Sequence, residues 1–211
     1  LYEIHGDVQR TLVNLNELPD YIKWATIAIE DKSFYKHKGV SVWGILRGVV
    51  WQTIRGKRVQ GGSTLTQQFI KNAVLTNERT VTRKIKEWLL SYKLEQKFSK
   101  DEILQMYLNE IPYGSTAYGV EAASQKYFGK SARELHLAEA AVLAALPQAP
   151  SRYSPYGSNK DLLIGRQHRV LDSMVEQLYI SEEEAENAKN YELVFNKQAS
   201  NIKAPHFVMY V

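Results

Sequence analysis

The sequence predicts a mainly α-helical fold with a short β element at its N-terminal end. Apolar residues recur at helical spacing from Pro19 to about residue 190, which is typical of helices that bury one face. Ser99–Glu102 and Ser181–Glu184 both match the capping box, in which a serine and a glutamate satisfy the first backbone N–H groups of a helix. With 211 residues, 44% of them hydrophobic, the chain can bury a sizeable core as one domain or two closely packed lobes.

The β element is expected before the first helix. Apolar and polar residues alternate over residues 1–15 around Gly6 and Asp7, a pattern that predicts two short strands joined by a turn. From Pro19 the spacing becomes helical, and proline suits a first helical turn because its missing N–H is not needed there. We expect this first helix to end at Glu30.

Two later segments are strongly apolar. Residues 138–146 are rich in alanine and precede Pro147, so they predict a helix that stops at the proline. Residues 41–58 are apolar almost all round, carry Trp43 and Trp51, and end in a cluster of arginine and lysine. This second segment fits either a core helix or a membrane-interface helix whose aromatic anchors and basic flank face anionic lipid.

Charge and composition limit the classes of partner. The net charge of +4 is mild and fits phosphate, pyrophosphate or an acidic membrane surface, whereas a nucleic-acid-binding protein would show a denser basic stripe. The chain has no cysteine, and its five histidines lack ligand spacing, so we predict no disulfide and no structural metal. No run of about 18 apolar residues is present. Because the chain begins abruptly at Leu1 and stops inside an apolar stretch at Val211, we interpret it as part of a longer protein.

Glu30 is the first candidate for chemistry. It follows a run of apolar residues at the end of the predicted helix, where the helix dipole is negative. Both the apolar surroundings and the dipole disfavour the charged carboxylate, so we expect a raised pKa in the range useful for a general base. An exposed acid at a helix end is the alternative.

A second polar segment follows a Gly-Gly pair. Residues 63–68 supply five hydroxyl and amide side chains within six positions. Ser63, Thr64 and Thr66 have no base close by in the sequence, so hydrogen bonding to a ligand is favoured over nucleophilic attack. Together with Glu30 this segment predicts a polar cleft for a hydroxyl-rich substrate such as a sugar.

Residues 81–92 form a third candidate segment with two different faces. Arg83, Lys84 and Glu87 lie on one face at spacings of three and four, while the apolar residues lie on the other, namely Val81, Ile85, Trp88, Leu89 and Tyr92. From spacing alone, such pairs are solvated surface salt bridges. With Lys71 and Arg79 upstream, however, four cations surround one acid, and that group could hold a pyrophosphate.

Four motifs then occur in a fixed order, over residues 30–39, 62–68, 83–87 and 100–109. They resemble the motif series of the peptidoglycan glycosyltransferase domain of glycosyltransferase family 51, found in class A penicillin-binding proteins and monofunctional transglycosylases. The likeness continues through residues 118–123, 127–130 and 146–151 and covers roughly residues 1–190.

The resemblance implies a lysozyme-like helical lobe with a smaller, membrane-associated jaw lobe at roughly residues 40–75. It places a glycosyltransferase domain at residues 1–195 and a linker at 196–211 that leads to a transpeptidase domain. It also implies an N-terminal transmembrane anchor that holds the domain on the outer face of the bacterial cytoplasmic membrane.

The resemblance further implies that the chain polymerises lipid II into β-1,4-linked glycan with inversion and releases undecaprenyl pyrophosphate. In that reaction Glu30 is the general base, and Glu87 is the second acid, which orients the cations and the donor. The family carries two arginines in the penultimate helix region, but this chain has Arg166 followed by Gln167, so only Arg166 is carried over. The remaining implied substrate-binding residues are Asp31, Phe34, His37, Ser63, Thr64, Gln67, Gln68, Lys71, Arg79, Arg83, Lys84 and Asn109.

Partners and alternatives follow from the same resemblance. Expected partners are lipid II, the growing glycan, the bacterial inner membrane, moenomycin-type inhibitors and other cell-wall synthesis proteins, with no nucleic acid. A pyrophosphate leaving group is compatible with Mg²⁺ or Mn²⁺, but the sequence offers no ligand set, and no cofactor is predicted. The alternative function is a lysozyme-like muramidase that cleaves the same polymer, since glycosidases also use a pair of carboxylates at the sugar bond. A membrane-docked scaffold without activity is the remaining alternative.

Overall fold

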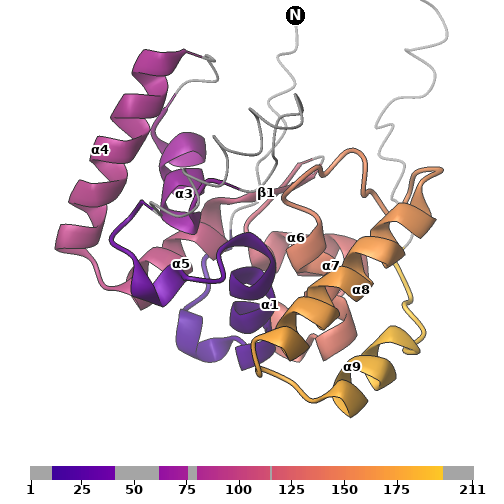
Figure 1. Ribbon diagram of the computed structural model, residues 1–211. Helices are drawn as coiled ribbons and strands as arrows, with labels where there is room; N and C mark the ends of the chain where they lie inside the picture. The colour runs from indigo at the N-terminus through magenta and orange to yellow at the C-terminus, as the bar shows by residue number, and fades with distance from the viewer. Residues whose placement is uncertain (1–10, 41–61, 76–79, 115, 197–211) are drawn as a thin grey trace, which may run out of the picture.

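A computed structural model describes residues 11–40, 62–75, 80–114 and 116–196. These residues are mostly helical, which confirms the predicted fold class (Figure 1). The α-helices are α1 (Asp20–Glu30), α3 (Leu65–Ala73), α4 (Val81–Lys97), α5 (Lys100–Glu110), α6 (Val120–Phe128), α7 (Leu137–Ala145), α8 (Lys160–Glu176) and α9 (Glu182–Lys189). Two short strands are β1 (Pro112–Gly114) and β2 (Ala117–Tyr118), and 3₁₀ turns cover Leu15–Glu17, Phe34–Lys36 and Ala132–Glu134.

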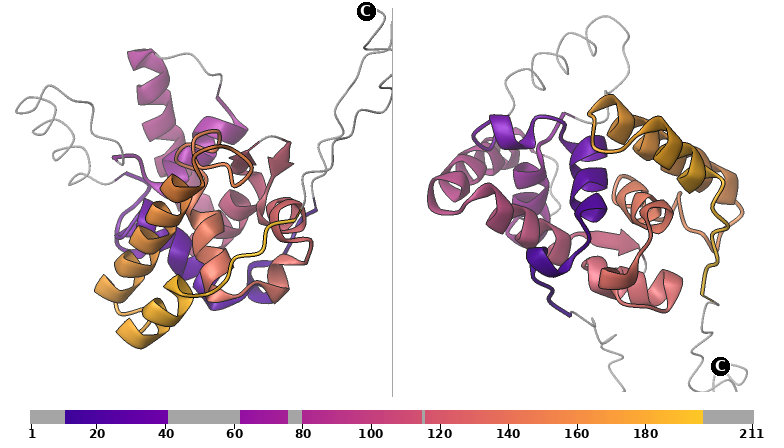
Figure 2. Two further views of the ribbon diagram at one scale, coloured as in Figure 1. Left: turned by 90° about the vertical axis from the view of Figure 1, so that its right-hand side faces the viewer. Right: turned by 90° about the horizontal axis from the view of Figure 1, so that it is seen from below.

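The larger group of helices forms around α1, α7 and α8. Helix α1 packs on both α7 and α8, and α9 packs on α8, as the two further views show (Figure 2). Small side chains make this packing close, because Ala25 and Ala28 of α1 are fully buried and every residue of α7 from Ala138 to Ala145 is buried. Helix α7 confirms the alanine-rich helix predicted before Pro147.

The second group consists of α3, α4 and α5. Helix α3 packs on both α4 and α5, and α4 stands at the edge of the molecule (Figure 1). The start of α3 is fixed by Thr64, whose hydroxyl accepts a hydrogen bond from the Gln67 N–H while the Gln67 side chain accepts one from the Thr64 N–H. This cap sets where the polar residues of α3 lie relative to the end of α1.

The described β element is not at the N-terminus. Strands β1 and β2 pair antiparallel between α5 and α6. Most of the strand pair expected over residues 1–15 lies outside the described residues, and the described part begins without strand structure and enters the 3₁₀ turn at Leu15. The expected jaw helix at 41–58 and the linker from residue 197 also lie outside the described residues. Among the helices that are described, none is long and apolar enough to cross a membrane.

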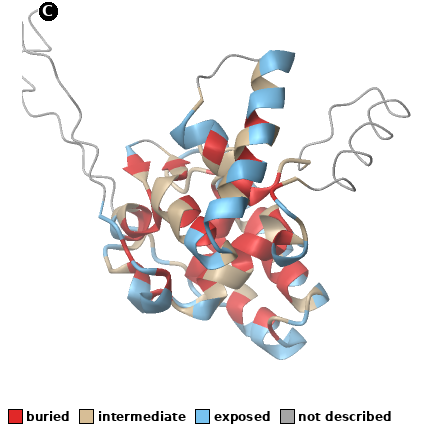
Figure 3. Ribbon diagram, turned by 90° about the vertical axis from the view of Figure 1, so that its left-hand side faces the viewer, coloured by how far each residue is buried: buried red, intermediate tan, exposed pale blue. Residues whose placement is uncertain are grey.

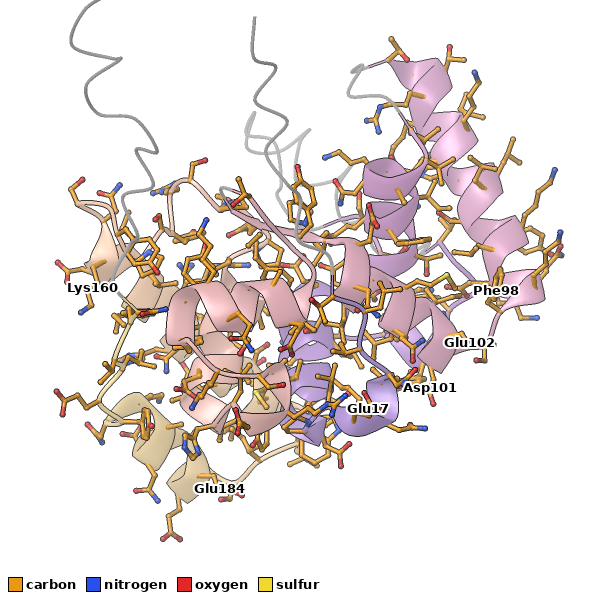
Figure 4. All side chains as sticks on the ribbon, turned by 180° about the vertical axis from the view of Figure 1, so that it is seen from behind. Glu17, Phe98, Asp101, Glu102, Lys160 and Glu184 are labelled. Atoms are coloured by element: carbon orange, nitrogen blue, oxygen red, sulfur yellow. The ribbon has the colours of Figure 1, made fainter. Side chains whose placement is uncertain are left out.

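The two predicted capping boxes are confirmed. The Ser99 hydroxyl accepts a hydrogen bond from the Glu102 N–H, and the Glu102 carboxylate accepts a 2.7 Å hydrogen bond from the Ser99 N–H. Ser181 and Glu184 form the same reciprocal pair at the start of α9. Figure 4 shows Phe98, Asp101 and Glu102 together at the turn between α4 and α5. Local capping chemistry therefore sets these two helix starts.

Candidate active site

Glu30 ends α1, as predicted, and its carboxylate is almost enclosed. The side chain is 12% exposed. Its Oε2 accepts a 2.8 Å hydrogen bond from the Gln68 amide of α3, and its Oε1 lies 3.5 Å from the Arg166 guanidinium of α8. Oε1 has no hydrogen-bond partner among the described residues. Three helices that are distant in the sequence thus meet at one carboxylate, whose Oε1 is buried beside Arg166.

The environment of Glu30 changes its acidity in the predicted direction. Burial raises the pKa of Glu30 above the ordinary glutamate value, and the nearby charge of Asp31 adds to this. The Gln68 hydrogen bond and the positive charge of Arg166 act in the opposite direction. Removal from water is therefore the main cause. A carboxylate with a raised pKa is a better proton acceptor near neutral pH, as a general base requires.

Tyr107 fixes the orientation of the Gln68 amide. Its ring is fully buried in α5, and its hydroxyl donates a 3.3 Å hydrogen bond to Gln68 Oε1. Because that oxygen is occupied, the amide NH₂ group faces Glu30. Sequence reasoning placed Tyr107 in a motif but did not assign it to the site, since nothing in the sequence indicates that α5 reaches α3 at this point.

Arg166 is held in place by the backbone and by an aromatic ring. Its Nε donates a 3.0 Å hydrogen bond to the Ala145 carbonyl at the end of α7, and its guanidinium lies 5.5 Å from the ring centre of Tyr153. Because the side chain is buried beside Glu30, its charge acts on the carboxylate with little screening by water. Arg166, the arginine carried over from the family pattern, thus reaches the candidate base.

Glu87 organises a second group of charges on α4. Arg83 Nη1 donates a 3.0 Å hydrogen bond to Glu87 Oε2, and the Lys84 ammonium pairs with Glu87 Oε1. Lys84 also donates a 2.9 Å hydrogen bond to the hydroxyl of Ser63, just before α3. The spacing alone predicted a solvated surface pair, and this was wrong because the Glu87 side chain is only 2% exposed. Lys84, at 35% exposed, keeps its ammonium partly open to solvent.

The two faces of α4 have the reverse of the usual arrangement. Glu87 and Ser91 are buried, whereas the side of the helix with Val81, Ile85 and Leu89 is exposed (Figure 3). The packing of α3 on α4 explains this, since it covers the polar side of α4 rather than the apolar side. An exposed apolar stripe on a folded helix is typical of a surface that contacts a protein partner or a membrane.

Glu95 extends the buried polar side of α4 and was missed by sequence reasoning. It accepts a 2.6 Å hydrogen bond from the Thr66 hydroxyl of α3 and pairs with Lys100 of α5 at 2.7 Å. The available signal was the spacing of four residues from Glu87 to Ser91 and again to Glu95, which places all three on one side of a helix. Glu95 thereby joins α3, α4 and α5.

Asp31 and the residues near it fix the turn after α1 against the start of α3. The Asp31 carboxylate accepts a 3.1 Å hydrogen bond from the Leu65 N–H and lies 2.8 Å from His37 Nε2. The Thr64 hydroxyl donates a 2.7 Å hydrogen bond to the Gly39 carbonyl. Asp31, His37 and Thr64 were expected at the substrate, and the contacts found for them are within the protein. They position Glu30 and α3 relative to each other.

Two other expected site residues also lie inside the protein. Gln67 is buried and caps α3, while Phe34 is fully buried with the Lys100 ammonium 4.6 Å from its ring centre. Their described surroundings are therefore protein groups, and a direct contact with substrate stays a prediction for both.

Among the described residues, two more were expected at the site, Asn109 and Lys71, and neither forms a hydrogen bond or ion pair with Glu30. Asn109 binds the backbone of Val13 in both directions at 2.9 Å, so its amide anchors the segment before α1. Lys71 is exposed on α3, and Arg79 lies outside the described residues. No group of three or more candidate metal ligands exists within the described residues.

Comparison with known proteins identifies the family. The sequence model of the family described as Transglycosylase matches residues 1–175. The chain belongs to this family. As a member, it is a peptidoglycan glycosyltransferase domain.

The similar proteins are penicillin-binding proteins. Penicillin-binding protein 1A of Neisseria lactamica is 44% identical over 94% of this chain and 25% of its own length, and that of Aquifex aeolicus is 46% identical over 94% and 27%. The chain thus spans about a quarter of these relatives. The crystal structure of penicillin-binding protein 1A from Haemophilus influenzae is 27% identical, with a TM-score of 0.53 over 90% of this chain and 19% of that one. The shared fold confirms the helical architecture.

Proposed function

We propose that this transglycosylase domain polymerises lipid II into β-1,4-linked glycan strands, with Glu30 as the general base. The observation that carries the proposal is the enclosed Glu30 carboxylate, which has a raised pKa and one oxygen without a protein hydrogen bond. A base of this kind can take the proton of a sugar hydroxyl only if the hydroxyl reaches that oxygen. The second group of charges, around Glu87, supports a charged leaving group.

The reaction is a single displacement. Glu30 accepts the proton of the 4-hydroxyl of the acceptor N-acetylglucosamine as its oxygen attacks the anomeric carbon of the donor N-acetylmuramic acid. The bond from that carbon to the phosphate oxygen breaks, and undecaprenyl pyrophosphate leaves with the electron pair. Attack from the face opposite the leaving group inverts the anomeric carbon and gives the β-1,4 link.

Lys84 and Arg83 are suited to the leaving group. Both side chains are held by the buried Glu87 carboxylate, and Ser63 accepts a hydrogen bond from Lys84. A cation that is already oriented stabilises negative charge on the pyrophosphate without a further cost of reorganisation. Glu87 therefore acts as a positioning residue that keeps the cations in place before the donor binds.

The membrane is the proposed location of the reaction, on the outer face of the bacterial cytoplasmic membrane. The exposed apolar stripe of α4 supports contact with lipid, since Val81, Ile85 and Leu89 lie on the same helix as the cations. A lipid-linked pyrophosphate has its charged group at the membrane surface, so a helix with one apolar and one cationic side matches it. The boundaries at residues 1–195 and 196–211 and the transpeptidase domain beyond them remain part of this proposal.

The rival function is a muramidase that cleaves the finished polymer. A hydrolase of neutral sugar bonds does not need the cations around Glu87. The purified protein would be incubated separately with lipid II and with finished glycan, and the products separated by gel electrophoresis. Strands formed from lipid II support the proposal. Release of short fragments from finished glycan, with no strands from lipid II, would establish the rival.

Glu30→Gln tests the base. Glutamine can still accept the Gln68 hydrogen bond but cannot take up the substrate proton, so we expect loss of polymerisation with an unchanged circular dichroism spectrum. Loss of the buried charge leaves stability equal or higher at neutral pH, because the raised pKa of Glu30 marks its charged form as destabilising. Retained turnover would remove Glu30 from the mechanism.

Lys84→Ala tests the leaving-group site, with Lys86→Ala as its matched control. Lys86 is an exposed lysine two residues away on the same helix. We expect a fall in turnover of about 100-fold for Lys84→Ala, in line with loss of one oriented group that stabilises developing charge. Equal effects of the two substitutions would mean that only the overall charge of α4 matters.

A further inference from the structure

A pocket of about 400 Å³ lies at the end of β1, separate from the contacts of Glu30 described above. It is lined by Gly114, by Lys126 and Tyr127 of α6, and by the loop that leads into α8, which contributes Ser151, Ser154 and Tyr156. This loop runs beside the β1–β2 pair and α6 (Figure 1). The volume falls within the range of small-molecule sites in proteins.

The lining of this pocket combines aromatic rings with polar groups. The rings of Tyr127 and Tyr156 lie 5.8 Å apart at 30°. The Ser154 oxygen accepts a hydrogen bond from the Tyr156 N–H, and its own O–H has no acceptor among the described residues. A sugar ring presents C–H groups on its face and hydroxyl groups around its edge. The Tyr156 ring with the Ser154 hydroxyl beside it matches both features.

Lys126 is the cation of the pocket. Its ammonium lies 5.9 Å from the ring centre of Tyr127, and no carboxylate pairs with it among the described residues. Burial lowers the pKa of Lys126, as expected for a lysine that is partly removed from water without a partner. Such a group can donate hydrogen bonds to sugar hydroxyls or to the carboxylates of a substituted sugar.

Hydrogen bonds within the protein hold the walls of the pocket together. The Tyr156 hydroxyl donates a 3.0 Å hydrogen bond to the Lys126 carbonyl, so the loop is attached to α6. The Tyr127 hydroxyl donates a 2.8 Å hydrogen bond to the Tyr113 carbonyl on β1. Since both hydroxyls are used within the protein and Tyr127 is buried, the half-buried Tyr156 ring, the Ser154 hydroxyl and the Lys126 ammonium are what remain for a ligand.

Two connections link the pocket to the candidate base. Burial is the main cause of the raised pKa of Tyr113, and the charge of Glu30 adds to it, so the strand residue before Gly114 lies within electrostatic reach of the carboxylate. On the other side, Tyr153 precedes Ser154 in the loop and lies against Arg166, which pairs with Glu30. A polymer that extends from Glu30 past β1 would reach this pocket.

We propose that the pocket at Lys126 and Tyr156 binds a sugar unit of the growing glycan strand. The proposal rests on the proposed function, because it takes the product of that reaction as its ligand. A strand held here stays bound between successive additions. The pocket therefore affects how many units are added before release, and it has little effect on the rate of a single addition.

The probe is a lipid-free tetrasaccharide of alternating N-acetylglucosamine and N-acetylmuramic acid, titrated by calorimetry into the purified protein. Lys126→Met removes the ammonium but keeps the bulk, and Lys97→Met, at an exposed lysine of α4, is its control. We expect the dissociation constant to rise at least about tenfold for Lys126→Met only, as for loss of one charged hydrogen bond. Strands made from lipid II by this variant should be shorter, at a similar initial rate of lipid II consumption.

Tyr156→Phe and Tyr156→Ala separate binding from folding. The phenylalanine keeps the ring face and should bind the tetrasaccharide, whereas the alanine should not. No binding by the unsubstituted protein, or equal binding and equal strand length for Lys126→Met, would overturn the pocket proposal. Failure of the unsubstituted protein to polymerise lipid II would instead overturn the proposed function, while the titration still reports on the pocket.

Discussion

Replacement of Gln68 by leucine gives a quantitative test of how the fold sets the acidity of Glu30. The amide of Gln68 donates a 2.8 Å hydrogen bond to Glu30 Oε2, and that bond lowers the pKa of the carboxyl. Leucine has a similar size but no donor. The substitution therefore removes stabilisation of the charged carboxylate while burial, which raises its pKa, remains.

The expected size of the effect follows from the nature of the bond. A hydrogen bond to a charged group contributes about 1.5–3 kcal/mol, and about 1.4 kcal/mol corresponds to one pKa unit. We therefore expect the pKa of Glu30 to rise by about one to two units in Gln68→Leu. Glu30 must be deprotonated to act as a base, so activity is lost as the pH falls through its pKa. The acid limb of the rate profile should move to higher pH by the same amount.

The assay is kcat/KM for lipid II polymerisation as a function of pH. Asn72→Ala is the control, because Asn72 is an exposed amide one turn further along α3 whose side chain donates its hydrogen bond to the Gln68 backbone carbonyl rather than to Glu30. Its acid limb should match that of the unsubstituted protein. An unmoved acid limb in Gln68→Leu, or an equal shift in Asn72→Ala, would refute the assignment of the limb to Glu30.

Two further predictions concern the surface of α4 and the turn after α1. Ile85→Ser should reduce binding to anionic liposomes in a flotation assay, with little change in stability because Ile85 is already 48% exposed. Leu162→Ser is the control, at a leucine of α8 that is 41% exposed, and it should leave liposome binding unchanged. Equal loss in both would argue against α4 as the lipid contact. Gly39→Ala should lower the free energy of unfolding in urea by about 1–3 kcal/mol, because Gly39 has φ +81° and an added Cβ would lie 2.8 Å from the backbone of Ser91. Gly165→Ala, in an open position on α8, should be neutral or stabilising, and equal stability of the two alanine variants would contradict the close approach at Gly39.

Local sequence rules predicted much of the helical framework. The caps at Ser99 and Ser181 and the end of α1 at Glu30 depend on residues within one or two turns of each other, so the sequence alone can specify them. The direction of the Glu30 pKa shift was predicted from the apolar run that precedes it, but its main cause is the burial that packing against α3 and α8 produces. The order of the motifs indicated the family, whereas residue spacing alone does not identify it.

The charges of α4 were beyond local reasoning. A helical wheel separates Glu87 from Ile85 and Leu89 but does not say which side will be covered. In the folded protein α3 covers the polar side, so Glu87 is buried and the apolar residues are exposed. The prediction of a solvated pair was wrong because it assumed that an apolar face always packs inward.

The sequence by itself determined where α5 and α9 begin and where α1 ends, and it singled out Glu30 as the candidate base. The tertiary structure decided that Gln68 and Arg166, from α3 and α8, would both reach Glu30, and that Asp31 and Asn109 would bind the backbone of their own chain. The physical reason is the range of the forces involved. Capping and periodicity act over a few residues of the chain, whereas the acidity of a buried carboxylate depends on whatever groups the packing of distant helices brings within a few ångströms.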